Sequence, residues 1–137
     1  MLSEALKDSI REAYGAIIER KSLTPRWGQR QMIAEIANAL SRIPLPGEER
    51  AGQPAVCVIE AGTGTGKTIA YAVAAIPMAQ ALGKRLVVAT ATIALQEQFV
   101  NKDLPDIRQS SGLDFSFTLA KGRRRYVCLS NLDRVMA

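Results

Sequence analysis

Apolar residues in the first part of the chain recur every three to four positions, which is the spacing of one helix face. The pattern predicts a helix over residues 2–20, with Ser3 as its N-cap, and a second helix over residues 27–41. Prolines, glycines and charged residues then gather in residues 43–54, which predicts a connector without regular structure. The sequence therefore opens with a helical lead-in.

Beyond Pro54, short apolar runs alternate with helical patterns. The predicted strands are residues 55–60, 85–91 and 115–120. The predicted helices are residues 66–82 and 93–100, followed by a polar stretch over 102–112 with breaks at Pro105 and Gly112, and by a last helix with Ser130 as a cap. This alternation predicts an α/β fold with a parallel sheet and right-handed crossovers.

Composition and charge exclude several classes of protein. The 137 residues include 47% hydrophobic and 23% charged residues, which is ordinary globular usage. There is no histidine, so histidine triads and histidine metal sites are excluded, and two cysteines are too few for a disulfide framework. The longest apolar run, residues 69–79, is shorter than the roughly 20 residues that span a membrane. We expect a cytoplasmic protein without a membrane partner, whose net charge of +5 is compatible with a polyanion.

The segment between the first predicted strand and the helix after it has the pattern of a phosphate loop. It consists of Ala61, Gly62, Thr63, Gly64, Thr65, Gly66, Lys67 and Thr68. Glycines let successive backbone N–H groups face phosphate oxygens, and the positive end of the following helix adds to the attraction. Lys67 can reach the β- and γ-phosphates, and the Thr68 hydroxyl can ligate Mg²⁺. Ala61 stands where the strict pattern has glycine, a change that we expect the loop to tolerate.

The acid that such an enzyme needs at the end of a second strand is not found. The one apolar run that ends in a carboxylate stops at Glu60, and this run feeds the loop itself. A guanine-reading N-K-x-D motif is also missing, because Asp103 comes one position early after Asn101 and Lys102. We therefore expect an incomplete catalytic unit that does not hydrolyse ATP by itself.

Polar residues elsewhere are candidates for ligand contacts. The Gln29 amide can donate to and accept from an adenine edge, although the same stretch also fits a plain helix start with Trp27 as a core anchor. Cys57 and Cys128 fit ordinary buried thiols. Candidate contacts to nucleic-acid phosphates follow the second strand, at Thr90, Thr92 and Gln96, although Thr92 also fits a helix cap. A basic segment, residues 121–126, combines Lys121, Arg123, Arg124, Arg125 and Tyr126; it suits single-strand pairing and stacking, or a solvated loop.

With these residues in view, the chain resembles the XPD-like group of iron–sulfur DNA helicases in superfamily 2. PRWGQRQMIAEIA is similar to the glutamine motif of that group, EAGTGTGKT to its first helicase motif and LVVATATIALQEQ to its motif Ia. KDLPDI and FSFTLAKGRRRYVC are similar to the stretch that enters its iron–sulfur domain. Four matches in the same order are more specific than any one of them.

The resemblance implies a P-loop NTPase with a RecA-like parallel sheet, of which this chain holds an incomplete first motor domain. It implies a lead-in with the glutamine motif over residues 1–43, a linker over 44–54, a partial motor domain over 55–120 and the entry to the iron–sulfur domain over 121–137. ATP and Mg²⁺ are the implied cofactors, held by Gln29, Gly64, Gly66, Lys67 and Thr68. Thr90, Thr92 and Gln96 would lie near single-stranded DNA.

The resemblance further implies that the parent protein couples ATP hydrolysis to 5′-to-3′ travel on single-stranded DNA, in DNA repair. Cys128 would be the first of four thiolate ligands of a [4Fe–4S] cluster, supplied otherwise by the remainder of the helicase chain. Two alternatives stay open from the residues alone. One is a small kinase whose arginine-rich lid is residues 123–125, and the other is a non-catalytic module that binds single-stranded nucleic acid.

Overall fold

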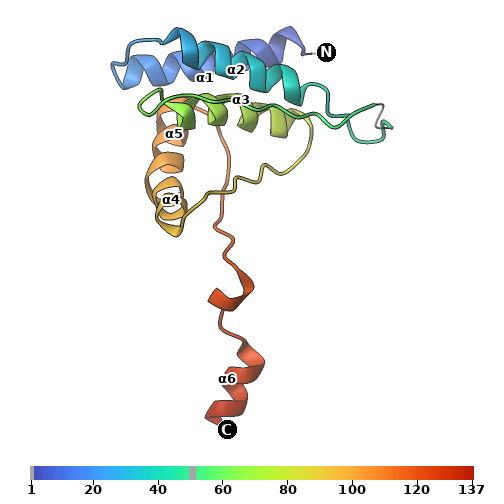
Figure 1. The fold of residues 1–137 in the computed structure, drawn as a ribbon, viewed down its shortest axis with the longest axis vertical. Helices are drawn as coiled ribbons and strands as arrows, with labels where there is room; N and C mark the ends of the chain where they lie inside the picture. Colours follow the sequence, from blue (N-terminus) through green and yellow to red (C-terminus); the bar gives the residue numbers. More distant parts are fainter. Residues whose placement is uncertain (1, 50–51) are drawn as a thin grey trace.

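Three helices form the core of the computed structural model, which describes residues 2–49 and 52–137. Helices α1 (Glu4–Arg20) and α2 (Trp27–Leu40) both pack against α3 (Lys67–Ala81), which lies beneath them in Figure 1. The predicted lead-in helices are thus confirmed to within a residue or two at each end. The predicted cap of the first helix is also confirmed, because the Ser3 hydroxyl accepts a hydrogen bond from the Leu6 N–H at 3.3 Å.

The core forms where α3 meets the two lead-in helices. Ile17 of α1 is 0% exposed, and Val73 and Met78 of α3 are also fully enclosed. Alanines at 70, 72 and 74 are buried along α3. Small side chains let helix backbones approach closely, so α3 can be covered on more than one side. The lead-in is therefore part of the core and not an appendage.

Helices α4 (Ile93–Gln98) and α5 (Leu104–Ser111) form one continuous helical stretch, joined by the π-helix η1 (Phe99–Asp103). The sequence predicted a polar stretch over residues 102–112 that is broken at Pro105 and Gly112. This prediction is wrong for the first break, because the chain stays helical through Pro105 as far as Ser111. Pro105 cannot donate an in-helix hydrogen bond, but the wide π turn directly before it, closed by the Leu104 N–H on the Phe99 carbonyl, lets the helix continue. The helix then ends at Gly112, which has a φ of +73°.

Helix α1 holds the end of α5 in place. The Arg20 guanidinium donates to the carbonyl oxygens of Gln109 (2.7 Å) and Ser110 (3.3 Å), and Lys21 forms an ion pair with Asp106. A cation suits the unpaired carbonyls at a helix C-terminus. This contact joins residues nearly ninety positions apart in the sequence.

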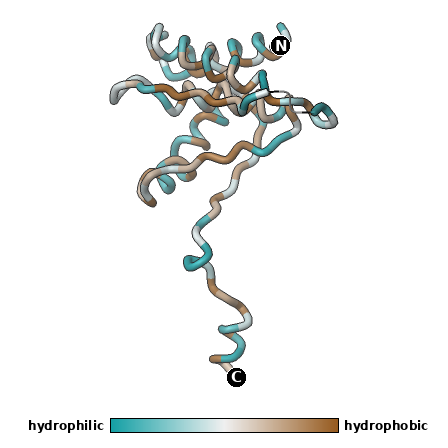
Figure 2. The backbone as a smooth tube through the Cα atoms, turned by 45° about the vertical axis from the view of Figure 1, so that its right-hand side comes forward, coloured by the Kyte–Doolittle hydropathy of each residue, from teal (hydrophilic) through white to brown (hydrophobic). Residues whose placement is uncertain are grey.

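The three predicted strands are extended, but the described part of the chain contains no strand ladder. Val58 is 91% exposed and Val87 is 85% exposed, so residues 55–60 and 85–91 carry apolar side chains into solvent. Figure 2 colours the backbone by hydropathy and marks the hydrophobic residues in brown. Strands pair only when their backbones come within about 5 Å of each other. Here the first two segments line a shared cavity instead of pairing. The expectation that Cys57 is buried is wrong for the same reason, since no neighbouring strand covers it.

The C-terminal segment leads away from the helical body (Figure 1). It contains the 3-10 helix η2 (Arg123–Arg125) and ends in α6 (Leu129–Met136). Helix α6 begins after Cys128, so the expected cap at Ser130 is wrong by two residues. Within residues 2–49 and 52–137, every helix falls short of the length and apolarity that crossing a membrane requires.

The core predicts a contrast between two alanine substitutions. Ile17→Ala removes a fully enclosed side chain and should lower the free energy of unfolding by about 2–5 kcal/mol, measured by urea denaturation. Val58→Ala should change it by less than about 0.5 kcal/mol, because the side chain is in solvent. A large loss in Val58→Ala would show that residues 55–60 are covered, contrary to this fold.

Candidate phosphate-binding site

The glycine-rich loop, residues 61–68, joins the extended segment 55–60 to the start of α3. Gly64 has a φ of +76° and Gly66 a φ of +77°, a region that side-chain-bearing residues rarely adopt. Gly66 is the N-cap of α3, so the first N–H groups of that helix open into the loop. This arrangement of free amides at a positive helix end can bind an anion.

Helix α2 contacts the loop closely at Gly66. A Cβ atom at Gly66 would lie 1.9 Å from Nε2 of Gln29, so a larger residue there would have to displace the Gln29 amide. The Gln29 side chain is only 6% exposed, and its Nε2 donates to the Gly66 carbonyl at 3.3 Å. The loop is therefore supported from below by the glutamine that the sequence suggested as an adenine contact.

A second residue at the start of α2 holds the loop one step earlier. The Arg26 guanidinium donates to the Gly64 carbonyl, and a Cβ atom at Gly28 would lie 4.0 Å from the Thr65 methyl group. Trp27 between them is 76% exposed, so its interpretation as a core anchor is wrong. Trp27 is free to turn outward because the contacts to the loop are made by its neighbours.

The Lys67 ammonium closes over the loop. Its Nζ donates to the carbonyls of Ala61 (2.7 Å) and Gly62 (3.0 Å), and the Thr65 hydroxyl also donates to Gly62. These are backbone acceptors with no charge of their own. A phosphate oxygen is a stronger partner for an ammonium group, so this lysine can exchange its bonds when an anion arrives.

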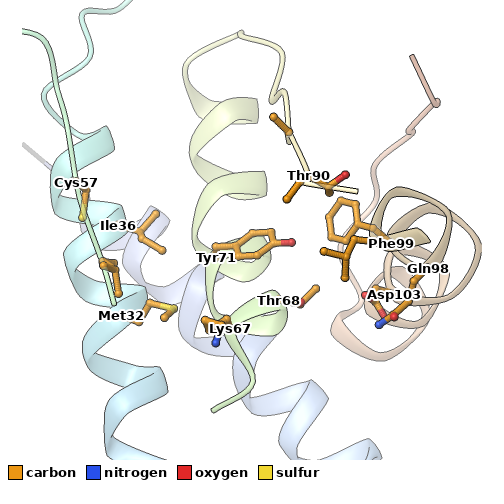
Figure 3. A pocket seen from close by; sticks show the side chains of 14 residues that line it. Met32, Ile36, Cys57, Lys67, Thr68, Tyr71, Thr90, Gln98, Phe99 and Asp103 are labelled. Carbon is orange, nitrogen blue, oxygen red and sulfur yellow. The ribbon is translucent and has the colours of Figure 1, made fainter. Parts of the chain in front are cut away.

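Lys67 and Thr68 also border a cavity of about 530 Å³ (Figure 3). Its walls come from the extended segments 55–60 and 85–91, from α3 and from the stretch α4–η1. Tyr71 lies across this cavity with its ring 5.9 Å from that of Phe99. Burial raises the pKa of Tyr71 above its ordinary 10.0, with a smaller lowering from the Thr68 hydroxyl and a smaller raising from Asp103.

Asp103 is a cavity residue that sequence reasoning missed. Among the described residues that line the cavity it is the one carboxylate, and it lies on the π-helix η1. The sequence analysis considered Asp103 only as part of a guanine-reading N-K-x-D motif, in which it comes one position early. No strand precedes it, so a search for acids at strand ends could not find it. A π turn near a site is a recurrent functional feature, but it has no simple sequence signature.

The candidate contacts to nucleic acid lie together on the α4 side of the cavity. The Thr92 hydroxyl caps α4 by accepting from the Leu95 N–H at 3.2 Å, which confirms the helix-cap interpretation. The Thr90 hydroxyl donates to the Thr92 carbonyl at 3.1 Å. The Gln96 amide donates to the Ala120 carbonyl at 3.3 Å. This last bond brings α4 beside the start of the basic segment.

The basic segment, residues 121–126, is open to solvent along most of its length. The Tyr126 hydroxyl accepts from the Lys121 N–H at 2.7 Å, which folds the segment into a turn around η2. Among the ion pairs of the described residues, none uses Arg123, Arg124 or Arg125. Their guanidinium groups are thus available for an anionic partner.

Cys128 is exposed at the start of α6. Outside residues 1, 50 and 51, the structure contains no group of three or more histidine, cysteine or acidic side chains that could hold a metal ion. One thiolate does not meet the ligand needs of an iron–sulfur cluster, so the residues present do not fit that group by themselves.

The sequence profile of DEAD/DEAH box helicases matches residues 27–130, from the start of α2 into α6. The match includes the loop and its support from α2, and it covers most of the chain. The chain therefore belongs to the DEAD/DEAH box helicase family, whose members have a P-loop NTPase fold.

Individual relatives are bacterial proteins with the name ATP-dependent DNA helicase DinG. The chain is 41% identical to that of Photobacterium profundum across its full length, and 45% identical to those of Escherichia coli K12 and Salmonella typhimurium across 96% of its length. The predicted resemblance to DNA helicases is thus confirmed, and these relatives carry the name DinG. The chain spans 17–19% of the length of these relatives.

The geometry of the loop predicts a graded effect of alanine at its glycines. Gly66→Ala meets both a positive φ and Gln29, and should lower the free energy of unfolding by about 2 kcal/mol or more. Gly64→Ala has the positive φ but open space, so about 1 kcal/mol is expected. Gly62→Ala has neither and is the matched control, with a change under about 0.5 kcal/mol in urea denaturation. Equal effects at the three positions would refute the close contact between Gln29 and Gly66.

Proposed function

We propose that this chain is the ATP-binding part of the first motor domain of an ATP-dependent DNA helicase. The observation that carries the proposal is the phosphate loop, which helix α2 holds open through Arg26 and Gln29 while α3 begins at Gly66. Membership in the helicase family and the names of the relatives support it.

In this proposal, the loop amides and Lys67 bind the phosphates of ATP, and Gln29 reads the adenine. Lys67 already has its ammonium at the mouth of the loop, 2.7 Å from the Ala61 carbonyl, and would transfer its bonds to the β- and γ-phosphates. The Thr68 hydroxyl would ligate Mg²⁺, which, when bound, offsets the phosphate charge. Asp103, a carboxylate that lines the same cavity as Thr68, would make this region favourable for a cation.

We also propose that the extended segments become strands of a parallel RecA-like sheet when further strands lie between them. The support is physical: residues 55–60 and 85–91 are extended, apolar and exposed, and the cavity separates them. Apolar, solvent-exposed segments gain free energy when neighbours cover them. The division into residues 1–43, 44–54, 55–120 and 121–137 is part of this proposal, although the packing of α1 on α3 ties the first part to the third.

For nucleic acid, we propose a path for single-stranded DNA over Thr90, Thr92, Gln96 and the basic segment. The bond from Gln96 to Ala120 supports it, because it joins α4 to the residue directly before the basic segment. Phosphate pairing by arginine together with stacking on Tyr126 suits a single strand. Travel in the 5′-to-3′ direction and a cluster ligand at Cys128 are carried over from the resemblance to iron–sulfur helicases.

The proposal predicts that Mg-ATP binding depends on Lys67. Lys67→Ala removes the charged donor at the loop and should raise the Kd for Mg-ATP at least about tenfold in isothermal titration calorimetry. Lys84→Ala, which removes an exposed lysine outside the loop, is the matched control and should leave the Kd unchanged.

Neither the unmutated 137-residue chain nor Lys67→Ala should release phosphate from ATP above the buffer rate. The sequence lacks the acid at the end of a second strand that ATP hydrolysis needs. Turnover that disappears in Lys67→Ala would contradict this inactivity while supporting the nucleotide site. Phosphoryl transfer to a small acceptor would favour the kinase alternative instead.

The basic segment predicts a salt-dependent affinity for single-stranded DNA. Replacing Arg123, Arg124 and Arg125 together by alanine should weaken binding of a labelled oligo-dT and flatten the plot of log affinity against log salt by about 2, at ~0.7 for each lost phosphate contact. The control removes the same charge from the exposed Arg42, Lys84 and Arg85, and should keep the slope. Fluorescence anisotropy measures both. Equal flattening in both variants would mean that the effect is one of net charge and not of a site.

A further inference from the structure

We infer that Arg20, in the last turn of α1, is a positioning residue for the nucleic-acid path, because it holds the end of helix α5, to which both halves of that path are joined. The inference rests on the path proposed above for single-stranded DNA. It adds to that path a residue of α1, which lies before the first residue that the helicase profile matches.

Helix α5 connects the two halves of the proposed path. On its N-terminal side it continues through η1 into α4, which begins after Thr92 and carries Gln96. On its C-terminal side the extended residues 113–120 lead to the basic segment. The Arg108 guanidinium of α5 lies 5.4 Å from the centre of the Phe117 ring, so α5 also contacts this extended stretch. The direction of α5 therefore affects both halves of the path.

Helix α4 has no buried residue that would anchor it directly. The nearest apolar anchor is Phe99 of η1, which is 8% exposed and contacts Tyr71 of α3, but both of these side chains border the open cavity. The next is Ile107, through which α5 joins the main core cluster. Apolar contacts are non-directional, so they hold this helical stretch against the core without fixing its tilt.

The hydrogen bonds from Arg20 add a fixed direction. The same guanidinium nitrogen donates to the carbonyl oxygens of Gln109 and Ser110, at 2.7 and 3.3 Å. These carbonyls lie in the last turn of α5, where a helix has no further N–H groups to pair with them. The ion pair between Lys21 and Asp106 lies about one turn earlier on α5. Directional contacts at two levels of α5 restrain its tilt relative to α1.

Helix α1 is itself fixed in the core that carries the phosphate loop. Ile17, one turn before Arg20, is 0% exposed, and α1 packs against α3, which begins at the loop. The loop does not depend on Arg20, because Arg26 and Gln29 of α2 hold it. Loss of the Arg20 bonds should therefore disturb the nucleic-acid path and leave the nucleotide site intact.

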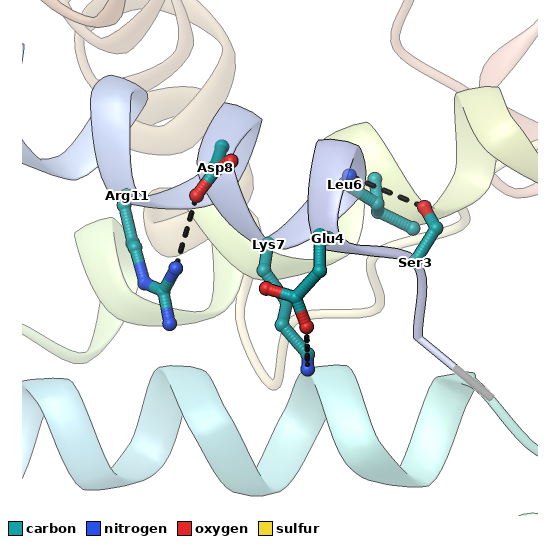
Figure 4. A network of polar contacts seen from close by, with 6 residues as sticks. All are labelled: Ser3, Glu4, Leu6, Lys7, Asp8 and Arg11. Atoms are coloured by element: carbon teal, nitrogen blue, oxygen red, sulfur yellow. Dashed lines mark hydrogen bonds and ion pairs between the residues drawn. The ribbon is translucent and has the colours of Figure 1, made fainter.

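The test compares Arg20→Met with the matched control Arg11→Met. The control removes an arginine of the same helix that pairs with Asp8 within α1 (Figure 4). In fluorescence anisotropy, the Kd for a labelled oligo-dT should rise about three- to fivefold in Arg20→Met, since one charge-assisted contact no longer favours the binding orientation. The control should keep the Kd of the unmutated chain. Arg20→Lys retains a cation that can donate to the same carbonyls, and should recover most of the affinity.

Three further measurements separate positioning from other roles. The slope of log affinity against log salt should stay the same in Arg20→Met, because no phosphate contact is lost. The Kd for Mg-ATP should also stay the same. Residual dipolar couplings of the α4 amides report the direction of α4 relative to α3 without any DNA, and they should change in Arg20→Met but not in Arg11→Met.

A salt slope that flattens by about 0.7 in Arg20→Met would mean that Arg20 itself pairs with a phosphate, and would overturn the inference. Equal losses of oligo-dT and Mg-ATP affinity would also overturn it, because they would show general destabilisation. So would unchanged dipolar couplings. An unmutated chain that does not bind oligo-dT would contradict the proposed path instead, and the dipolar couplings would still decide whether Arg20 sets the direction of α4.

Discussion

The approach of helix α2 to the phosphate loop is the constraint on which the site depends. At Gly66 the Gln29 amide occupies the place where a side chain would begin, 1.9 Å from an ideal Cβ. Only glycine allows this contact, and only glycine readily adopts the φ of +77° with which α3 begins. The same residue thus supports the loop from one side and turns its amides outward on the other.

The helices explain why that contact is stable. Helix α1 is buried against α3, and α2 packs on α3 along its length, so the elements that touch the loop are fixed by the core. Arg26, Gln29 and Tyr14 are then held by hydrogen bonds that cross between α1, α2 and the loop. In many phosphate-loop proteins a sheet is the expected scaffold. In the described part of this chain, helices α1, α2 and α3 support the phosphate loop instead, and the extended segments 55–60 and 85–91 are exposed.

The sequence predicted local features well. Helix periodicity, the caps at Ser3 and Thr92, and the helix start directly after the glycine-rich loop each depend on residues a few positions apart, and each is confirmed. Sheet formation depends on pairing with strands that are distant in the sequence. An apolar run such as residues 85–91 has the same sequence pattern whether it is paired in a sheet or exposed to solvent. The predicted break at Pro105 was wrong because a π turn before this proline lets the helix continue, and a π turn has no plain sequence signature.

Other parts of the site could not be predicted from the sequence. No pattern links Tyr14 to Gln29, fifteen positions later on another helix, because their contact follows from how the two helices pack. Asp103 was visible in the sequence but had no role until the fold placed it on the same cavity as Thr68. Trp27 was expected inside because tryptophan is usually buried, but here its neighbours make the contacts.

The central claim is that residues 61–68 form a site for a nucleotide triphosphate tail. A nuclear magnetic resonance titration of the isotope-labelled chain with Mg-ATP tests it most directly. The account predicts saturable shifts of the backbone amide signals from Gly62 to Thr68 and of the Gln29 side chain, while the signals of α6 stay in place. Shifts confined to the basic segment, or none at all, would contradict it.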